Sequence, residues 1–298
     1  MPDRLKIALV GAGHMGRLHA RTIAAREDAA LVAVCDTDAA AAAALAETYG
    51  ARALGEVEGL AGAVDAVVLA AATSAHRDLA LPLIRAGVPL LVEKPLAGTA
   101  AEAREIARAA ERADALLQVG HILRFDPVTR AIAERTFTPA EIRVSWRSPF
   151  TGRSTDISVV MDLAIHSIDL VLKWAGRMPE EVTATGRTVK GPHTDEVEVH
   201  LAFAGGCVAD LFASRVSETR ERRIRIAAGR ETIELDYAAR TVRWGSEALP
   251  VETGPDALTA QMNSFLAAVR GEAPVAVSAD EGARAVEVAE RIERAAAV

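Results

Sequence analysis

The chain has 298 residues, of which half are hydrophobic and a quarter charged, and its net charge is −7 at neutral pH. This length is enough for one large domain or for two of ordinary size, each with its own apolar core. The acidic balance argues against nucleic acid and anionic membranes as partners, although a local arginine cluster can still bind an anionic small-molecule substrate.

The cysteine content and the apolar runs narrow the class of protein further. The two cysteines, Cys35 and Cys207, lie in no CxxC pair, which argues against a disulfide framework and a cysteine-based zinc site. The apolar run of "MPDRLKIALVG" is too short for a signal peptide, and no segment approaches the length of a membrane span. We therefore expect a cytoplasmic protein without a metal centre.

The first 120 residues alternate strand-like and helix-like segments. Apolar runs predict five strands and the segments between them predict four helices. The strands are expected at 6–11, 31–36, 66–71, 88–93 and 115–120, and the helices at 14–26, 38–48, 75–86 and 99–112. Continuously apolar strands separated by helices are typical of a parallel sheet covered on both faces. An α/β Rossmann domain, a doubly wound parallel sheet, is thus predicted for residues 1–122.

The pattern changes after residue 123. A short helix is expected from Pro127, a strand over 141–146 and a helix around 159–170. From 181 to 244, runs of alternating polarity are separated by turn signals, and "AGG" and "AGR" each predict a hairpin. Two helices are expected near 256–270 and 279–296. Residues 123–298 are therefore predicted to form an α+β domain, with a largely antiparallel open sheet and helices on one side.

The stretch "GAGHMG" places Gly11, Gly13 and Gly16 in a G-x-G-x-x-G pattern between a predicted strand and a helix. Such glycines sometimes only shape a turn, but here Asp36 follows Gly16 by twenty residues, at the end of the next strand. Glycines let the backbone approach a pyrophosphate, and a carboxylate at that position accepts ribose hydroxyls and repels a 2′-phosphate. The motif predicts an NAD site, to which His14 and Met15 of the same loop also belong.

The carboxyl ends of the later strands supply further cofactor ligands, because ligands of open α/β sheets bind there. In "VEKPL", Lys94 follows a buried strand, and Pro95 favours an extended backbone that aims the lysine. A solvated loop lysine and packed core histidines are the ordinary alternatives. The residues predicted to contact the cofactor at these strand ends are Thr73, His76, Glu93, Lys94 and His121.

The stretch "VVMDLAIHSIDL" carries Asp162, His166 and Asp169 at helical spacing. At 3.6 residues per turn the three side chains share one face of an otherwise apolar helix. Two interpretations of these three residues are a hydrogen-bonded core histidine beside solvated aspartates and a metal site. We favour a third, acid–base chemistry, because imidazole titrates near neutral pH and an adjacent carboxylate can set its basicity.

The motifs "GAGHMGRLHA", "EKP" and "DLAIHSIDL", in this order, resemble those of the Gfo/Idh/MocA oxidoreductase family, and "SADEGARAVEVAERI" resembles its closing helix. The resemblance covers essentially the whole chain. It implies NAD(P)-linked oxidation or reduction at a sugar-type carbon, and a homo-oligomer, dimer or tetramer, formed through the open sheet. It also implies that Lys94, Asp162 and His166 are the catalytic residues, with Asp169 in a supporting position.

A narrower resemblance, to the UDP-N-acetylglucosamine 3-dehydrogenase branch, rests on "VGHILRFDP" and on residues 148–172 and 205–217. It implies oxidation of the 3-hydroxyl of a UDP-linked N-acetyl sugar, a partner aminotransferase and a role in lipid A formation. Leu123 departs from the glutamate or other polar residue that is frequent in the branch. A dehydrogenase of a free polyol or aldose such as myo-inositol, a non-enzymatic NAD-binding regulator and a structural subunit remain as alternatives.

A nucleotide sugar needs cationic partners, because guanidinium groups bind pyrophosphate oxygens in a fork. The predicted substrate ligands are Arg124, Arg153 and Arg215 together with Lys94, Asp162 and His166; Arg147 lies in a similar segment. Surface arginines are also common without any such role. In the mechanism we expect, His166 takes the hydroxyl proton, Asp162 polarises the imidazole and Lys94 hydrogen-bonds the alkoxide. Lys94 and His166 can exchange the role of base.

Overall fold

The computed structural model describes residues 4–152 and 157–297. The chain divides into two compact units, one of residues 1–121 with 258–283 and the other of residues 122–257 with 284–298. The division predicted from the sequence, 1–122 and 123–298, differs in the segment 258–283. Its helix buries Met262, Phe265 and Leu266 in the core of the first unit, so a stretch far along the chain completes that core.

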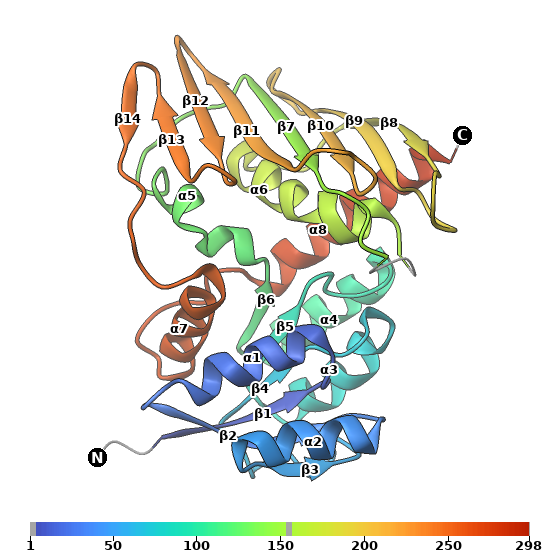
Figure 1. Cartoon of the computed structure of the whole chain (residues 1–298), viewed down its shortest axis with the longest axis vertical. Coiled ribbons are helices and arrows are strands. Elements are labelled where there is room, and N and C mark those ends of the chain that lie inside the picture. Colours follow the sequence, from blue (N-terminus) through green and yellow to red (C-terminus); the bar gives the residue numbers. More distant parts are fainter. Residues whose placement is uncertain (1–3, 153–156, 298) are drawn as a thin grey trace. The chain divides into compact units, whose positions relative to one another are not determined.

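The first unit holds a six-stranded parallel sheet in the order β3-β2-β1-β4-β5-β6 (Figure 1). The five predicted strands are present, and β3 is an addition at the edge. The strands are β1 Leu5–Val10, β2 Ala29–Cys35, β3 Arg52–Leu54, β4 Ala66–Leu69, β5 Leu90–Glu93 and β6 Leu117–Gly120. The helices are α1 His14–Ala24, α2 Ala39–Tyr49, α3 His76–Arg85, α4 Ala100–Arg112 and α7 Ala257–Val269.

One face of this sheet packs against α1, α2 and α7, which share a single hydrophobic core with β1, β2 and β4. On the other side α3 contacts β4 and β5 and packs against α4. Because both faces are covered, β4, β5 and β6 are buried over their whole length, as their continuously apolar sequences predict. The prediction of a Rossmann-type sheet is therefore confirmed.

The second unit contains an eight-stranded sheet in the order β14-β13-β12-β11-β7-β10-β9-β8. β7 and β10 are parallel and every other neighbouring pair is antiparallel. The strands are β7 Glu141–Arg147, β8 Glu181–Arg187, β9 Glu196–Ala202, β10 Val208–Ser214, β11 Glu221–Ala228, β12 Glu231–Asp236, β13 Thr241–Trp244 and β14 Glu247–Leu249. Both predicted hairpins, β9–β10 and β11–β12, are present, and the largely antiparallel sheet is confirmed.

The two faces of this sheet differ in chemistry. Ile142, Val144 and Trp146 of β7 are buried on the face covered by helices, where α5 Pro127–Arg130, α6 Ile165–Ala175 and the later part of α8 Ala279–Ala296 lie (Figure 1). The alternate residues of β7, among them Arg143 and Arg147, point to the opposite, uncovered face. That face is lined by ion pairs between neighbouring strands, such as Arg223–Asp236 and Arg225–Glu234.

The helix predicted around 159–170 is present, but its first turn is not a regular α-helix. Val160–Ala164 form a π-helical turn, which continues directly into α6. The sequence predicts only a helix here and gives no sign of the wider turn. π-Helical turns are rare overall, but many of those that occur are found at functional sites. The residues of this segment are therefore candidates for a functional role.

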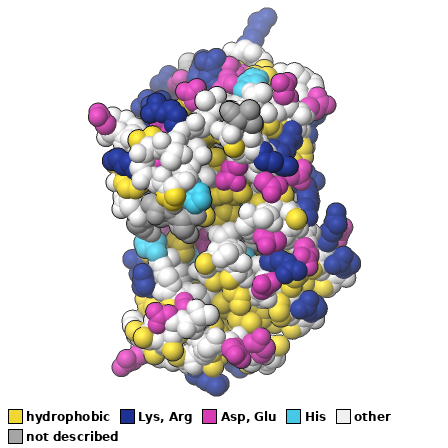
Figure 2. Space-filling model, turned by 90° about the vertical axis from the view of Figure 1, so that its right-hand side faces the viewer, with side chains coloured by type: hydrophobic (Ala, Val, Ile, Leu, Met, Phe, Trp, Pro, Cys, Tyr) yellow, Lys and Arg dark blue, Asp and Glu magenta, His cyan; other side chains and the backbone are white. Residues whose placement is uncertain are grey.

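The described residues, 4–152 and 157–297, also bear on membrane spans, metal sites and surface charge. None of their helices is long and apolar enough to cross a bilayer. Within the same ranges, no three His, Cys, Asp or Glu residues are placed together so that they could hold a metal ion. Acidic and basic side chains are interspersed on the face shown in Figure 2.

Candidate active site

The glycine-rich loop of the first unit is shaped by close backbone contacts. Gly11 has φ 102°, and a Cβ there would lie 2.5 Å from the backbone of Ala70. A Cβ at Gly16 would overlap the carbonyl oxygen of Gly11, so this glycine brings α1 against β1. By contrast, a Cβ at Gly13 would meet no atom within 4 Å. The loop is therefore tightly fixed at Gly11 and Gly16 and open at Gly13, where a pyrophosphate can approach the backbone.

The start of α1 supplies the complementary charge. Gly13 is the N-cap and provides no side-chain hydrogen bond, and the first turn contains no acidic residue. His14 and Met15 are the first two helical residues. An uncapped helix N-terminus offers N–H groups and the positive end of the helix dipole to an anion. This geometry fits the pyrophosphate of a dinucleotide.

Asp36 directly follows β2 and reaches the glycine-rich loop. Its Oδ2 accepts a hydrogen bond from the Ala12 N–H at 2.6 Å, and its Oδ1 accepts one from the Asp38 N–H at 2.9 Å. The residue remains partly exposed, and each carboxylate oxygen has a further lone pair. Asp36 therefore fixes the loop while keeping the capacity to accept ribose hydroxyls, as NAD binding requires.

Glu93, the last residue of β5, is a support rather than a surface ligand. It is 6% exposed, and its Oε1 lies 2.7 Å from Nε2 of His19, which is fully buried. Its Oε2 accepts a hydrogen bond from the Lys94 N–H at 3.2 Å. Burial alone would raise the pKa of Glu93, but the His19 hydrogen bond and the Lys94 charge hold it below its ordinary value. Glu93 thereby stays ionised and fixes the backbone of Lys94.

His19 was not among the residues predicted from the sequence. It lies on α1, three residues after Gly16, and its burial was the signal that could have singled it out, since buried polar side chains need partners. Gly120 of β6 completes the arrangement, because a Cβ there would lie 3.0 Å from the Glu93 carboxylate.

The other predicted cofactor ligands lie at the same edge of the sheet. Thr73 begins a short 3₁₀ turn after β4, and His121 follows β6 and is buried. The His76 ring is also buried, with Nδ1 3.0 Å from the carbonyl oxygen of Pro95 and Nε2 3.1 Å from that of Ala71. Burial lowers the pKa of His76, although the two carbonyls oppose this. The ring therefore joins the loop after β4 to the turn that carries Lys94, where the Lys94–Pro95 peptide bond is cis.

In the second unit, Asp162 and His166 occupy the segment with the π-helical turn. Asp162 lies within that turn and His166 in the first turn of α6. Both are partly exposed, whereas the intervening Ala164 and Ile165 are buried. The acid and the imidazole are therefore both partly accessible, which is compatible with the acid–base role predicted for this acid–imidazole pair.

Asp169, the third residue predicted to share this helix face, has a different environment. It is 1% exposed and is held by Arg124 in a two-point ion pair, with Nε–Oδ2 and Nη2–Oδ1 distances of 2.7 Å. Arg124, predicted as a substrate ligand, is itself buried by this contact. The pair anchors α6 one turn beyond His166, which agrees with a supporting role for Asp169.

The remaining predicted arginines are distributed differently. Arg215 is 5% exposed, and its Nε donates to Asp195 Oδ1 at 2.7 Å while Nη1 donates to the Ile157 carbonyl at 2.7 Å. It therefore ties the loop at Asp195 to the segment that leads into the π-helical turn. Arg147 lies on the uncovered face of the sheet, over the ring of Phe212. Arg153 lies outside the described residues.

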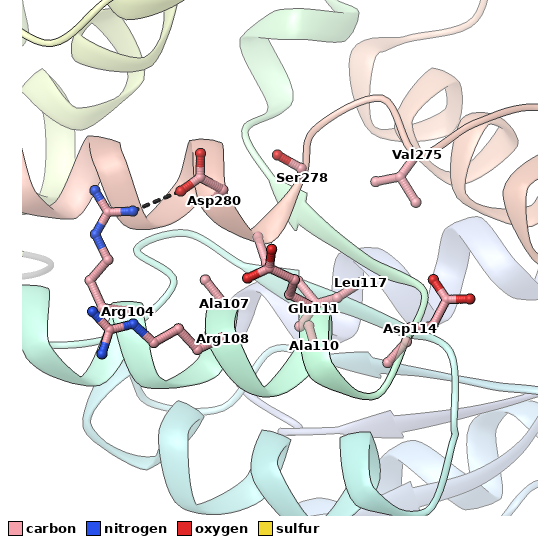
Figure 3. A pocket seen from close by; sticks show the side chains of 12 residues that line it. Arg104, Ala107, Arg108, Ala110, Glu111, Asp114, Leu117, Val275, Ser278 and Asp280 are labelled. Atoms are coloured by element: carbon pink, nitrogen blue, oxygen red, sulfur yellow. Dashed lines mark hydrogen bonds and ion pairs between the residues drawn. The ribbon is translucent and has the colours of Figure 1, made fainter.

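A groove of about 720 Å³ also crosses the first unit (Figure 3). It runs along α4 and the segment 275–280, and an Arg104–Asp280 ion pair of 2.7 Å spans it. Its lining includes Leu117, the first residue of β6. Since ligands of open α/β sheets bind at the carboxyl ends of the strands, this groove at the amino end of β6 is distinct from the glycine-rich loop.

The open glycine loop, the uncapped α1 and Asp36 define a Rossmann domain built to bind a dinucleotide. The family model described as "Oxidoreductase family, NAD-binding Rossmann fold" matches residues 5–121, and that of the "GFO/IDH/MocA C-terminal domain" matches residues 131–234. The chain belongs to the Gfo/Idh/MocA oxidoreductase family. Its first unit binds NAD, and the resemblance stated from the sequence is confirmed.

Individual relatives resemble the chain over nearly its full length. UDP-N-acetylglucosamine 3-dehydrogenase from Acidithiobacillus ferrooxidans is 32% identical over 96% of this chain and 95% of its own. A solved structure of that enzyme has a TM-score of 0.92 and covers 98% of each chain. An inositol 2-dehydrogenase from Rhizobium meliloti is 30% identical over 98% of this chain and 97% of its own. The protein is thus an NAD-dependent dehydrogenase of a family whose members act on sugars and polyols.

Proposed function

We propose that the protein oxidises the 3-hydroxyl of UDP-N-acetylglucosamine and passes the hydride to NAD. The observation that carries this proposal is the likeness, over essentially the whole chain, to an enzyme named for that reaction, with a TM-score of 0.92. A helix that presents Asp162 and His166 together supports catalysis rather than cofactor binding alone. A non-enzymatic regulator would have no use for such a pair.

The roles of the residues follow from their chemistry. His166 accepts the proton of the sugar hydroxyl, and Asp162 orients the imidazole and stabilises its protonated form. Lys94, which Glu93 fixes through its backbone N–H, donates a hydrogen bond to the oxygen as negative charge develops on it. NAD, when bound, supplies the acceptor for the hydride.

Oxidation of a free polyol such as myo-inositol is the second candidate function. It is supported by the inositol 2-dehydrogenase that is 30% identical over 98% of this chain. The same three residues serve both reactions, so the alternatives differ in what the rest of the substrate contacts. A UDP-linked substrate brings a diphosphate, which a free polyol lacks.

The test is an absorbance assay for reduced nicotinamide with NAD and four substrates: UDP-N-acetylglucosamine, UDP-glucose, myo-inositol and glucose. An aminotransferase that consumes the 3-keto sugar, the partner we propose for the product, is included to draw the equilibrium toward oxidation. Turnover of UDP-N-acetylglucosamine alone is the expected result. Turnover of myo-inositol without turnover of either UDP sugar would replace the proposal by the polyol reaction.

A further inference from the structure

Arg222 is a partly buried arginine of the second unit. It lies on β11, on the face of the sheet that the helices cover, as do Ile224 and Ile226. Its Nε is shielded from solvent and has no hydrogen-bond partner in the described parts of the chain. A shielded N–H without an acceptor costs free energy, so the Arg222 guanidinium has unused capacity to bind an anion.

Further charges gather around Arg222. Burial lowers the pKa of Arg222, and the positive charge of Arg220 lowers it further, while Asp126 opposes both. Burial raises the pKa of Asp126, although hydrogen bonding from Val128 and the charges of Arg240 and Arg222 oppose this rise. Arg222 and Arg240 thus lie near enough to Asp126, and Arg220 near enough to Arg222, for their charges to affect one another. We call Arg220, Arg222, Arg240 and Asp126 the cationic corner.

An aromatic ring lies beneath Arg222, the central arginine of the cationic corner. The guanidinium carbon of Arg222 lies 5.3 Å from the ring centroid of Trp146, which is 2% exposed. The ring centroids of Tyr237 and Trp146 lie 5.4 Å apart, and the Tyr237 hydroxyl is 2.8 Å from the Thr129 hydroxyl. An arginine stacked on an aromatic ring is already ordered, so little conformational entropy is lost when it binds a ligand.

The corner and the acid–imidazole pair are linked by one short segment of the same unit. Arg222 is the register partner of Trp146, next to the last residue of β7. Asp126 follows Arg124 by two residues, and Arg124 holds Asp169 one turn beyond His166. The segment that contains Arg124 and Asp126 therefore contacts both the helix of His166 and the cationic corner.

We propose that the cationic corner binds the diphosphate of a nucleotide-linked sugar, with Arg222 as its central ligand. The guanidinium fork matches phosphate oxygens, and three guanidinium charges together with the one Asp126 carboxylate give the corner a net positive charge that matches the two negative charges of a diphosphate bridge. As a statement about the substrate this rests on the proposed function. The binding of a diphosphate at the corner can be measured without any turnover.

The test is calorimetric titration of the full-length protein with UDP, with Trp fluorescence as a second signal because Trp146 lies beneath Arg222. We expect Arg222→Gln to weaken UDP binding at least tenfold and Arg240→Gln, at an exposed position, to weaken it severalfold. The matched control is Arg225→Gln, on the same strand but on the uncovered face and paired with Glu234. It should leave UDP binding unchanged.

Equal UDP binding by wild type, Arg222→Gln and Arg240→Gln would overturn the assignment, as would the absence of UDP binding to the wild type. Arg240→Gln keeps the test decisive if Arg222→Gln fails to fold, since its side chain is outside the core. The experiments distinguish failure of the diphosphate site from failure of the proposed function. If UDP-N-acetylglucosamine is oxidised with a KM that neither variant changes, the corner is wrong and the function stands. If UDP binding depends on Arg222 but no UDP sugar is oxidised, the corner stands and the function is wrong.

Discussion

His19 Nε2 and Glu93 Oε1 lie 2.7 Å apart in the core of the first unit. Their contact joins α1, the helix that opens at the glycine-rich loop, to the residue before Lys94. Because a carboxylate only accepts hydrogen bonds, the imidazole donates through Nε2. One buried hydrogen bond therefore connects the expected pyrophosphate site to the backbone of Lys94, the lysine proposed to be catalytic.

Replacing His19 by Leu should destabilise the protein by about 2 kcal/mol, because it leaves a buried carboxylate without its main donor. NAD binding should weaken, whereas His19→Gln, which keeps an N–H donor, should retain most of both properties. Denaturant unfolding and NAD titration measure the two effects. The control is His200→Leu, since the His200–Asp210 pair has the same 2.7 Å distance but is exposed; it should change stability by less than about 1 kcal/mol. Equal effects of the two Leu substitutions would contradict this assignment.

The glycine-rich loop offers a matched pair of substitutions. Gly16→Ala should destabilise the first unit, because its Cβ would overlap the Gly11 carbonyl. Gly13→Ala should fold with wild-type stability, since its Cβ would meet no protein atom within 4 Å, yet bind NAD at least tenfold more weakly because the methyl group occupies the approach of the pyrophosphate. Thermal unfolding with and without NAD separates the two. Undiminished NAD binding by Gly13→Ala would place the pyrophosphate elsewhere.

Replacing His166 by Ala should lower turnover by roughly a hundredfold or more if its imidazole is the general base. The side chain is partly exposed, so the thermal midpoint should change little. Asp162→Asn should reduce turnover as well and alter its pH profile, because the carboxylate sets the basicity of the imidazole. His200→Ala, a substitution on the uncovered face of the sheet, serves as the control. Wild-type turnover in the His166 variant would remove this residue from the mechanism.

Asp195 predicts a specific dependence of stability on pH. Burial raises its pKa, but three backbone N–H groups and Arg215 outweigh this and hold the pKa far below the ordinary value of 3.8. Because the folded-state pKa is lowered, the stabilisation is fully present above pH 3.8 and is lost as the pH falls toward the folded-state value. Near neutrality, Asp195→Asn should cost about 3–5 kcal/mol, because it removes the buried negative charge that accepts hydrogen bonds from Arg215 Nε and three backbone N–H groups.

Chemical unfolding of wild type and Asp195→Asn between pH 3 and pH 7 measures this dependence. The difference in free energy of unfolding should be constant from pH 5 to 7 and should narrow below about pH 4. The exposed carboxylate of Asp210 provides the control substitution, Asp210→Asn, which should show a small difference throughout. A gap that widens on acidification would contradict the assigned direction of the shift.

Much of the fold could be predicted from local sequence patterns. The apolar strands of the parallel sheet and the alternating strands of the hairpins were identified because burial on two faces and on one face leave different periodicities. The edge strands β3 and β14, of three residues each, are too short to show either. The place of α7 in the first unit was also missed, because local pattern does not reveal which core a terminal helix joins.

The candidate site could be predicted where a motif places chemistry at a fixed position, as with Gly11, Gly16 and Asp36. The sequence could not show which polar side chains satisfy each other. Arg124 and Arg215 were predicted as substrate ligands, and the structure pairs them with Asp169 and Asp195 over long sequence separations. Arg222 was not predicted, because the alternating pattern of its strand does not show that its Nε lacks a hydrogen-bond partner among the described residues. Such pairings depend on tertiary contacts, which a single sequence does not display.

The most direct test of the proposed reaction follows the hydrogen that is transferred. UDP-N-acetylglucosamine carrying deuterium at carbon 3 of the sugar is incubated with the protein, NAD and the aminotransferase, and the reduced nicotinamide is analysed by mass spectrometry. The account predicts that the deuterium appears in the reduced cofactor and that the sugar product carries a nitrogen at carbon 3. Reduced cofactor without deuterium would show that another carbon is oxidised, and it would contradict the central claim.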